Sequence, residues 1–394
     1  MDRSAASTRV PRDPVDDYTV EAAAVRRAFL LERAGARLDH VAGGSVDPSS
    51  VRGNVEQFVG VAQVPIGVAG PLLVDGEHAR GEFFVPLATT EGALVASYNR
   101  GMKLLHEAGG IRTTVMEDSM QRAPAFVFAS ARESRAFGDW LAEHFDEIKQ
   151  VADGTTGFGR LQGIERYSAS RILFTRFDYT TGDAAGQNLT SNATAAACAW
   201  ITDHYPDVVE CFLESNFATD KKSSHVNTLR TRGKRVVAEA TIPAVLIERH
   251  LRTTPPAMFR ARQVAALGGF MSGVNNNGSQ SANAVAALFV ATGQDVANVA
   301  ESSAALSFGE VLPGGDYYVS ITIPSLVVAT YGGGTALPTQ RECLELLGCY
   351  GAGQVRKLAE IVAATVLCGE LSLGSAIVAG EWVDAHERLG RNRR

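Results

Sequence analysis

Cysteine is scarce in this sequence, and no cysteine lies in a recognisable pairing pattern. The five cysteines among 394 residues form no CxxC pair and no disulfide-framework spacing, which indicates reduced thiols in a cytoplasmic protein. The sequence also lacks HExxH, GxSxG and paired His/Cys motifs. It therefore supports neither metal-assisted hydrolysis nor serine-nucleophile chemistry, and it predicts no metal site.

An excess of positive charge is also missing. The 37 Lys and Arg residues are outnumbered by 43 Asp and Glu residues, which gives a net charge of −6. Proteins that bind nucleic acid or anionic membranes need a basic surface, so neither partner is expected. The first residues lack the apolar core of a signal peptide. The apolar runs at 284–291 and 361–368 are well short of the ~20 residues that cross a bilayer.

Apolar and small residues, in contrast, are plentiful. Hydrophobic residues make up 45% of the chain and charged residues 20%, enough for a large core in about two or three domains. Hydrophobic spacing predicts an irregular alternation of helices and strands, which is the pattern of an α+β or mixed α/β fold. The helices are expected at 20–37, 94–106, 134–148, 192–204, 282–291 and 355–367. Strands are expected at 125–128, 171–179 (an edge strand) and 236–243, with short strands and turns over 58–86.

Two loops before predicted helices carry candidate functional groups. Glu91, in the segment TTEG, lies at a strand-to-helix junction, where a carboxylate either complements the helix dipole or belongs to an active site. Asp183 lies in the glycine-punctuated segment TTGDAAGQN. This segment either presents backbone N–H groups to a phosphate or caps the following helix.

Four further charged or titratable residues lie in three other segments, where local patterns favour a surface position or require a partner. Lys221 and Lys222, in TDKK, are typical of a solvated loop when considered alone. Asp295, in GQD, follows a nearly uncharged helix and needs a partner if it is buried, and a lysine is the obvious one. His386 precedes an arginine-rich tail and is expected to be exposed on local grounds.

Taken in order, several segments resemble class I 3-hydroxy-3-methylglutaryl-CoA (HMG-CoA) reductases, in their soluble catalytic form. These segments are NVEQFVGVAQVPIGVAGPL, VPLATTEGALVASYNRG, MQRAP, TTGDAAGQN, TDKK, GQDVANV, PSLVVATYGGGT and GELSLGSAIVAG. The resemblance implies an α+β fold with an N-terminal helical segment (1–58) and a large substrate-binding catalytic domain (59–122 and 214–394). A smaller ferredoxin-like dinucleotide-binding domain would be inserted at 123–213. It also implies a homodimer or homotetramer with active sites at the subunit interface.

The resemblance further implies the chemistry. Members reduce an acyl thioester to a primary alcohol with two hydrides from NADPH, by default HMG-CoA to mevalonate and free CoA in isoprenoid biosynthesis. Glu91 would donate a proton to the carbonyl oxygen, and Lys221 would stabilise the oxyanion. Asp295 would pair with this lysine, and His386 would protonate the departing thiolate. The implied substrate-binding residues are Arg122, Lys222, Glu214 and Asp220. The implied cofactor-binding residues are Thr156, Gly157, Phe158, Asp183, Ala184, Gly186, Gln187, Asn188, Asn283 and Arg391.

The sequence departs from the family at the substrate and cofactor sites. Glu214 replaces a serine that contacts the acyl carboxylate, and Gln263 replaces a lysine, so both changes disfavour a carboxylate-bearing substrate. Gly157 replaces an arginine that contacts the 2′-phosphate of NADPH; NADPH is still favoured, with NADH as the alternative. A different acyl-CoA or a carrier-bound thioester is therefore an alternative substrate. An inactive binding paralogue is disfavoured, because all four catalytic residue types are retained.

Overall fold

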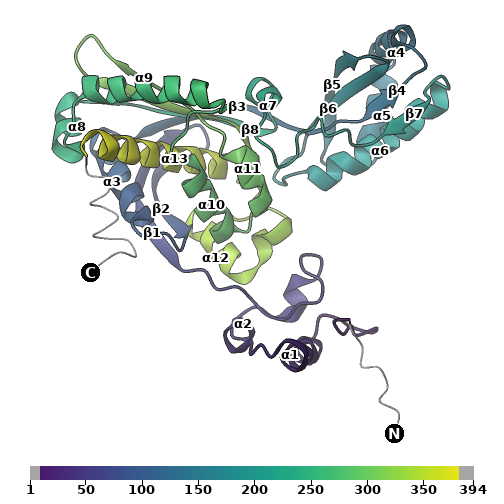
Figure 1. The fold of residues 1–394 in the computed structure, drawn as a ribbon, viewed down its shortest axis with the longest axis horizontal. Helices are drawn as coiled ribbons and strands as arrows, with labels where there is room; N and C mark the ends of the chain where they lie inside the picture. Colours follow the sequence, from purple (N-terminus) through teal and green to yellow (C-terminus); the bar gives the residue numbers. More distant parts are fainter. Residues whose placement is uncertain (1–8, 381–394) are drawn as a thin grey trace.

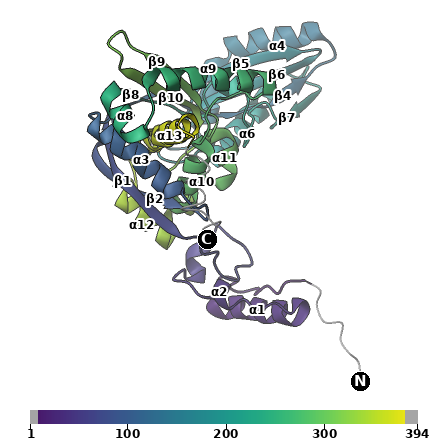
Figure 2. The same ribbon diagram turned by 60° about the vertical axis from the view of Figure 1, so that its left-hand side comes forward.

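The N-terminal segment is helical and projects from the rest of the molecule (Figure 2). The computed structural model describes residues 9–380, beginning with α1 (Val20–Ala34), α2 (Asp39–Ala42) and the short 3-10 helix η1 (Pro48–Val51). The helix predicted to reach residue 37 ends earlier, because Gly35 adopts a left-handed conformation with φ 63° and terminates it. The buried Arg26 donates to the carbonyl of Phe58 (2.9 Å), which ties α1 to the chain that enters the central body.

The central body is built on a mixed sheet. Its strands are β1 (Ile66–Gly76), β2 (Arg80–Ala88), β3 (Ile111–Arg122), β8 (Gly233–Ile242), β9 (Leu306–Val311) and β10 (Tyr317–Leu326). The strands β3, β8, β10 and β9 pair antiparallel in that order, whereas β1 pairs antiparallel with β2 and parallel with β3. This sheet provides the platform on which the helices of the body pack.

A long apolar helix, α13, runs through the middle of the body (Figure 1). The other helices are α3 (Leu94–Glu107), α7 (His225–Leu229), α8 (Ala244–Leu251), α9 (Pro255–Ser272), α10 (Ser281–Thr292), η2 (Val296–Asn298), α11 (Val299–Ser302), η3 (Gly333–Ala336) and α12 (Pro338–Leu346). α13 (Val355–Val378) contacts α3 so closely that a side chain at Gly101 would collide with the carbonyl of Cys368. Its length and mean hydropathy of 1.9 would suffice for a membrane span, but 78% of the apolar stretch is buried inside the protein, as expected of a core helix.

The remaining part is a small α/β lobe with its own core. It contains β4 (Ala125–Val127), α4 (Ala131–Glu143), α5 (Phe145–Asp153), β5 (Arg160–Ala169), β6 (Ile172–Thr180), α6 (Gln187–His204) and β7 (Glu210–Phe212). The antiparallel strand order β7-β4-β6-β5 and the βαββαβ chain order are those of a ferredoxin-like fold. Phe126, Phe137 and Phe177 are fully buried in this core. The predicted α+β class is therefore confirmed.

Two local predictions in this lobe are wrong. The single helix expected at 134–148 is two helices that meet at His144, whose backbone leaves the helical region at φ −105° and ψ 22°. The strand expected at the edge, β6, is internal, because it pairs with β4 on one side and β5 on the other. Its alternating pattern arises because successive side chains of β6 point to opposite faces of the sheet, which differ in burial. The pattern does not require an open edge.

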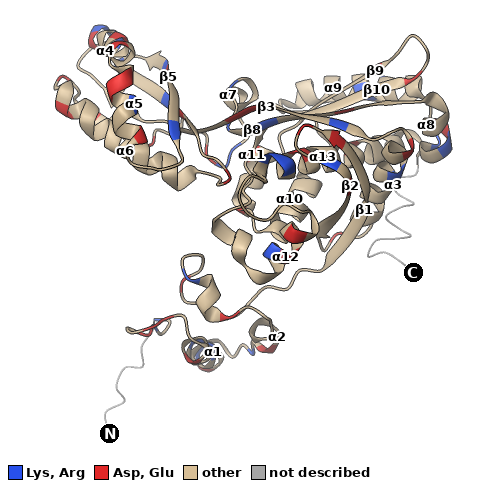
Figure 3. Cartoon of the chain, turned by 180° about the vertical axis from the view of Figure 1, so that it is seen from behind, with Lys and Arg blue, Asp and Glu red and all other residues tan. Residues whose placement is uncertain are grey.

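The strand β3 connects the lobe with the body. Residues Arg112–Ser119 of β3 pair with β8, and Met120–Arg122 pair with β6. Both signs of charge occur along the ribbon where β3 and β8 run between the two parts (Figure 3). Arg122, at the end of β3, therefore lies at the junction of lobe and body.

Candidate active site

The predicted lysine–aspartate pair forms. Nζ of Lys221 lies 3.0 Å from Oδ2 of Asp295, and the two side chains are 45% and 44% exposed. Lys221 belongs to the loop after β7, and Asp295 follows α10 and accepts the backbone N–H of Ala297 (3.0 Å). The partner of Asp295 is thus a lysine, as expected, but the pair is half-exposed and open to a ligand.

The loop that carries Lys221 has an unusual backbone. Asn216, Thr219 and Lys221 have φ of 65°, 61° and 60°, in the left-handed region that few residues other than glycine occupy. The backbone N–H of Lys221 donates to Oε1 of Glu301 (3.1 Å). Strained residues of this kind cluster at functional sites and persist only where the surroundings hold them.

Arg122 is held by two carboxylates beside this loop. Its Nη1 lies 2.8 Å from Oε2 of Glu214 and 3.1 Å from Oδ2 of Asp220, and its Nη2 donates to the carbonyl of Gln187 (3.1 Å). Glu214 also accepts the N–H of Asn216 (2.7 Å). Arg122 is only 8% exposed, so its charge is largely neutralised within the chain.

Lys222 is the more available cation of this group. Its Nζ donates to the backbone carbonyl of Asp220 (2.9 Å), and no carboxylate of residues 9–380 lies within 4.0 Å of it. Lys222 is exposed, whereas Arg122 is buried and paired with two carboxylates.

Glu91 lies elsewhere in the chain. Its carboxylate accepts from Nδ2 of Asn283 at 3.0 and 3.3 Å, and Asn283 is in the first turn of α10. Asp295 follows the other end of this helix, whose 12 residues rise about 18 Å. Within one chain, Glu91 and the Lys221–Asp295 pair therefore lie at opposite ends of α10.

A cavity opens at the Asp295 end of α10. Its volume is ≈ 730 Å³, and its lining includes Ala184, Gly186, Gln187, Asn188 and Asp295 together with 331–334. α6 begins here at Gln187, and its N-cap, Gly186, makes no side-chain capping hydrogen bond, so the first N–H groups of this 18-residue helix are available. A helix N-terminus with free N–H groups favours an anionic group such as a pyrophosphate.

The sequence is similar to known proteins over nearly its whole length. A sequence profile of hydroxymethylglutaryl-coenzyme A reductase matches residues 22–391. The chain belongs to this family. It is 44% identical to the 3-hydroxy-3-methylglutaryl-coenzyme A reductase of Pyrococcus horikoshii over 93% of this chain and 91% of that protein. It is also 44% identical to the enzyme of that name from Aeropyrum pernix, over 94% and 90% of the two chains. The family predicted from the sequence is confirmed.

Solved structures of the family share the fold. A class II 3-hydroxy-3-methylglutaryl-CoA reductase from Streptococcus pneumoniae, bound to NADPH in open conformations, aligns with a TM-score of 0.68 and 21% identity. The alignment covers 91% of this chain and 96% of that one. The mixed helix and sheet architecture described above is therefore that of HMG-CoA reductases.

Within this family fold, Asp183 has a structural task. Its carboxylate accepts the N–H groups of Gly353 (2.8 Å) and Val355 (3.2 Å), at the start of α13. The N-cap of α6 is Gly186 instead, so the interpretation of Asp183 as the cap of that helix is wrong. Asp183 fixes the loop of α6 to the body and is not among the residues that line the cavity.

The other predicted cofactor residues are dispersed. Thr156, Gly157 and Phe158 lie in the loop between α5 and β5 and are not among the lining residues, and Phe158 is 85% exposed. The loop borders the cavity, because a side chain at Gly159 would meet the lining residue Leu189. Asn283 is with Glu91 at the far end of α10. His386 and Arg391 lie outside the described residues.

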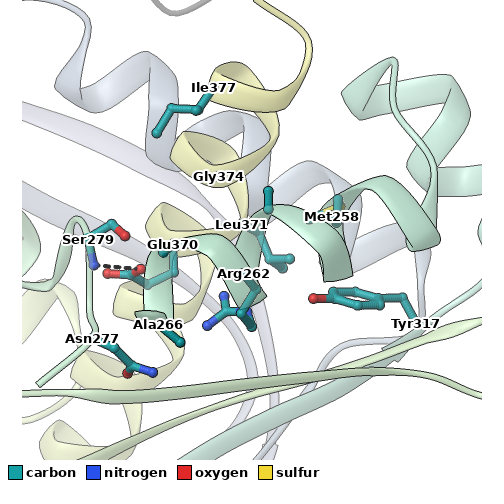
Figure 4. Close-up of a pocket in the computed structure, with 12 residues that line it drawn as sticks. Met258, Arg262, Ala266, Asn277, Ser279, Tyr317, Glu370, Leu371, Gly374 and Ile377 are labelled. Atoms are coloured by element: carbon teal, nitrogen blue, oxygen red, sulfur yellow. Dashed lines mark hydrogen bonds between the residues drawn. The ribbon is translucent and has the colours of Figure 1, made fainter. Parts of the chain in front are cut away.

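A second, smaller cavity lies between α9 and α13 (Figure 4). Its volume is ≈ 100 Å³, and Arg262, Tyr317 and Glu370 line it. Glu370 accepts the N–H groups of Ser279 (2.8 Å) and Gln280 (2.6 Å), and burial raises its pKa. The volume suits a few water molecules and not an acyl-CoA. Gln263, which follows Arg262, is exposed on α9.

Sequence reasoning missed three charged residues near the predicted sites. Arg232 and Glu301, both fully buried, form an ion pair behind the Lys221 loop. Arg160 donates to the carbonyls of Gly159 (2.6 Å) and Gly157 (3.3 Å) and places a guanidinium in the loop where the family arginine is missing. No local sequence pattern distinguishes these three residues from ordinary surface charges. Arg232 and Glu301 could have been found only by predicting that their side chains are buried, because buried charges need partners.

Proposed function

We propose that this chain reduces HMG-CoA to mevalonate and free CoA, with the uptake of two hydrides and two protons. The observation that carries the proposal is the Lys221–Asp295 pair (3.0 Å) at the mouth of a cavity that suits a dinucleotide. The names of relatives that are 40% or more identical over more than nine-tenths of this chain support the same reaction.

Lys221 supplies the positive charge that this reaction needs. When hydride adds to a thioester carbonyl, negative charge develops on oxygen, and a fixed ammonium stabilises this charge more than it stabilises the ground state. Asp295 holds the lysine side chain in place. The same ammonium serves again when the aldehyde intermediate is reduced to the alcohol.

Glu91 and His386 are the proposed proton donors. Glu91 delivers a proton to the carbonyl oxygen, and its two contacts with Asn283 orient the carboxyl group. His386 protonates the thiolate of CoA as the thiohemiacetal collapses, a role that suits the ordinary titration range of imidazole.

NADPH is the proposed cofactor, and it supplies hydride when bound. The free N–H groups at the start of α6 would hold its pyrophosphate, beside Gln187, whose Nε2 donates to Oδ1 of Asn298 (3.1 Å). Arg160 and Arg391 are the cations that we assign to the 2′-phosphate. Thr156 accepts N–H groups of its own loop at 3.2 Å and shapes that region.

A thioester without a carboxylate is a second candidate substrate. Glu214 lies 2.8 Å from Arg122, so a substrate carboxylate must compete with a carboxylate of the chain itself. Lys222 and Asp220 would then contact a neutral or polar acyl group as well as they would contact an acyl group that bears a carboxylate. The alternative is an acyl-CoA or carrier-bound thioester of otherwise the same chemistry.

The active site that we propose is shared between two copies of the chain. Glu91 and Lys221 are attached at opposite ends of α10, so one copy would contribute Glu91 and Asn283 while its partner contributes Lys221 and Asp295. α9 exposes a row of apolar side chains suited to such an interface: Val264, Leu267, Phe270 and Met271 are between 59% and 84% exposed. We assign the protein to a homodimer or a homotetramer, to class I and to the cytoplasm.

The test is oxidation of NADPH by the purified protein with HMG-CoA, a neutral acyl-CoA and a carrier-bound thioester, with mevalonate and free CoA measured as products. Lys221→Ala should lower kcat by about 10²–10³-fold, because it removes the oxyanion partner. Binding of NADPH, followed by fluorescence, should survive. Turnover of this variant near the wild-type rate would contradict the mechanism.

A further inference from the structure

A buried ion pair lies directly behind the loop of Lys221. Arg232, which precedes β8, and Glu301, in α11, are both fully buried, and their Nη1 and Oε1 atoms lie 2.5 Å apart. Burial raises the pKa of the Glu301 carboxyl and lowers that of the Arg232 guanidinium, while each favours the charge of the other. Buried pairs of this kind add little net stability compared with apolar residues, so stability alone does not account for the pair.

Both members of the pair hold the loop. Oε1 of Glu301 accepts the backbone N–H of Lys221 (3.1 Å), and Nη2 of Arg232 pairs with Oδ1 of Asp220. Two consecutive loop residues are therefore fixed, one through its backbone and one through its side chain. Asp220 in turn contacts Arg122 (3.1 Å).

The loop requires such support. Thr219 and Lys221 have φ of 61° and 60°, and non-glycine residues keep this conformation only when their surroundings determine it. If the loop relaxed, the backbone of Lys221 would turn and its ammonium would leave Asp295. Displacement of a catalytic group by about 1 Å can reduce the rate by about 10²-fold.

We propose that Arg232 and Glu301 are positioning residues that hold Lys221 in the conformation in which its ammonium reaches Asp295 and the reacting carbonyl. The inference rests on the proposed role of Lys221. It assigns the buried pair to the geometry of the catalytic loop and not to the stability of the fold.

The test compares Glu301→Gln with a matched variant, Glu360→Gln. Glu360 is also fully buried and accepts three backbone N–H groups, from Glu77, His78 and Ala79 (3.2, 3.0 and 2.7 Å), but it holds the turn between β1 and β2. We expect Glu301→Gln to lower kcat about 10- to 100-fold while the Kd of NADPH is unchanged. Glu360→Gln should lower the Tm and leave kcat within about twofold of wild type.

Amide hydrogen exchange at residues 219–222 gives a readout that does not depend on activity. Exchange at Lys221 should be about tenfold faster in Glu301→Gln, because the charge-assisted hydrogen bond is lost, and unchanged in Glu360→Gln. If wild type reduces no thioester, the proposed function fails, but exchange still decides whether Glu301 holds the loop. Wild-type exchange and kcat in Glu301→Gln, or equal loss of kcat in both variants, would overturn the inference.

A second variant covers the case in which Glu301→Gln does not fold. Arg232→Lys keeps the positive charge, but its single ammonium nitrogen replaces the two guanidinium nitrogens that reach Asp220 and Glu301 separately in a planar fork. We expect the same faster exchange at Lys221 and a similar loss of kcat. Wild-type values for both quantities would also overturn the inference.

Discussion

Nζ of Lys221 and Oδ2 of Asp295 lie 3.0 Å apart, although one belongs to the loop that returns from the small lobe and the other to the end of α10. This contact places a cation at the edge of the ≈ 730 Å³ cavity. Glu91 is not part of this group, because it contacts Asn283 at the opposite end of the same helix. The residues that we propose for catalysis therefore form two groups within one chain, one at each end of α10.

Mixing two inactive variants should restore activity. Glu91→Gln and Lys221→Ala each remove one group of the shared site. In a mixed dimer, one of the two sites then combines an intact Lys221 with the partner's intact Glu91. Random exchange of subunits should give about a quarter of the wild-type turnover, measured as NADPH oxidation after co-refolding or co-expression. If both groups act within one chain, every mixed dimer remains inactive.

Replacement of Glu214 should improve the use of HMG-CoA. Two charges about 4 Å apart interact by up to ~4 kcal/mol at an effective dielectric constant near 20. Glu214→Ser frees Arg122 for the substrate carboxylate, and relief of only about 1.4 kcal/mol raises kcat/KM tenfold. A neutral acyl-CoA should gain nothing. Glu143→Ser, which removes an exposed carboxylate at the end of α4, is the control, and an equal gain in both variants would refute the explanation.

An arginine at position 157 should increase the preference for NADPH. A side chain at Gly157 would meet open space, so the substitution is tolerated by the fold and restores a partner for the 2′-phosphate. Gly157→Arg should lower the KM for NADPH and leave that for NADH unchanged. Gly314→Arg, which adds the same charge at another open glycine, should change neither value. Wild-type preference for NADPH by several thousand-fold would show that another residue already provides the selectivity.

The stability of the small lobe should depend on pH through Asp178. Burial raises the pKa of this carboxyl, on β6, from 3.8 to about 6. The folded state therefore keeps a proton that the unfolded state has lost, and stability falls as the pH rises through this interval. Asp178→Asn should match wild type at pH 4 and exceed it above pH 6, by at most about 3 kcal/mol. Denaturant unfolding at pH 4 and pH 7.5 measures the difference; the same difference at both values would contradict the assignment.

Local signals in the sequence were sufficient for several elements. The helix expected at 94–106 is α3, and the strand expected at 125–128 is β4. Hydrophobic periodicity and glycine act over a few residues, so these elements are encoded where they occur. The break between α4 and α5 and the internal position of β6 were not predictable in this way, because they depend on packing against other elements.

The sequence by itself determined the family and supplied the residues that we propose for catalysis, because long motifs such as VPLATTEGALVASYNRG point to both without reference to shape. Tertiary structure alone decided which residues meet. In the folded chain Lys221 pairs with Asp295, and Glu214 pairs with Arg122. Asp183 accepts a backbone N–H at the start of α13. Arg232 is buried beside Glu301. Each of these contacts joins segments far apart in the chain, and the energies that select them come from burial and charge pairing, which exist only after the chain has folded.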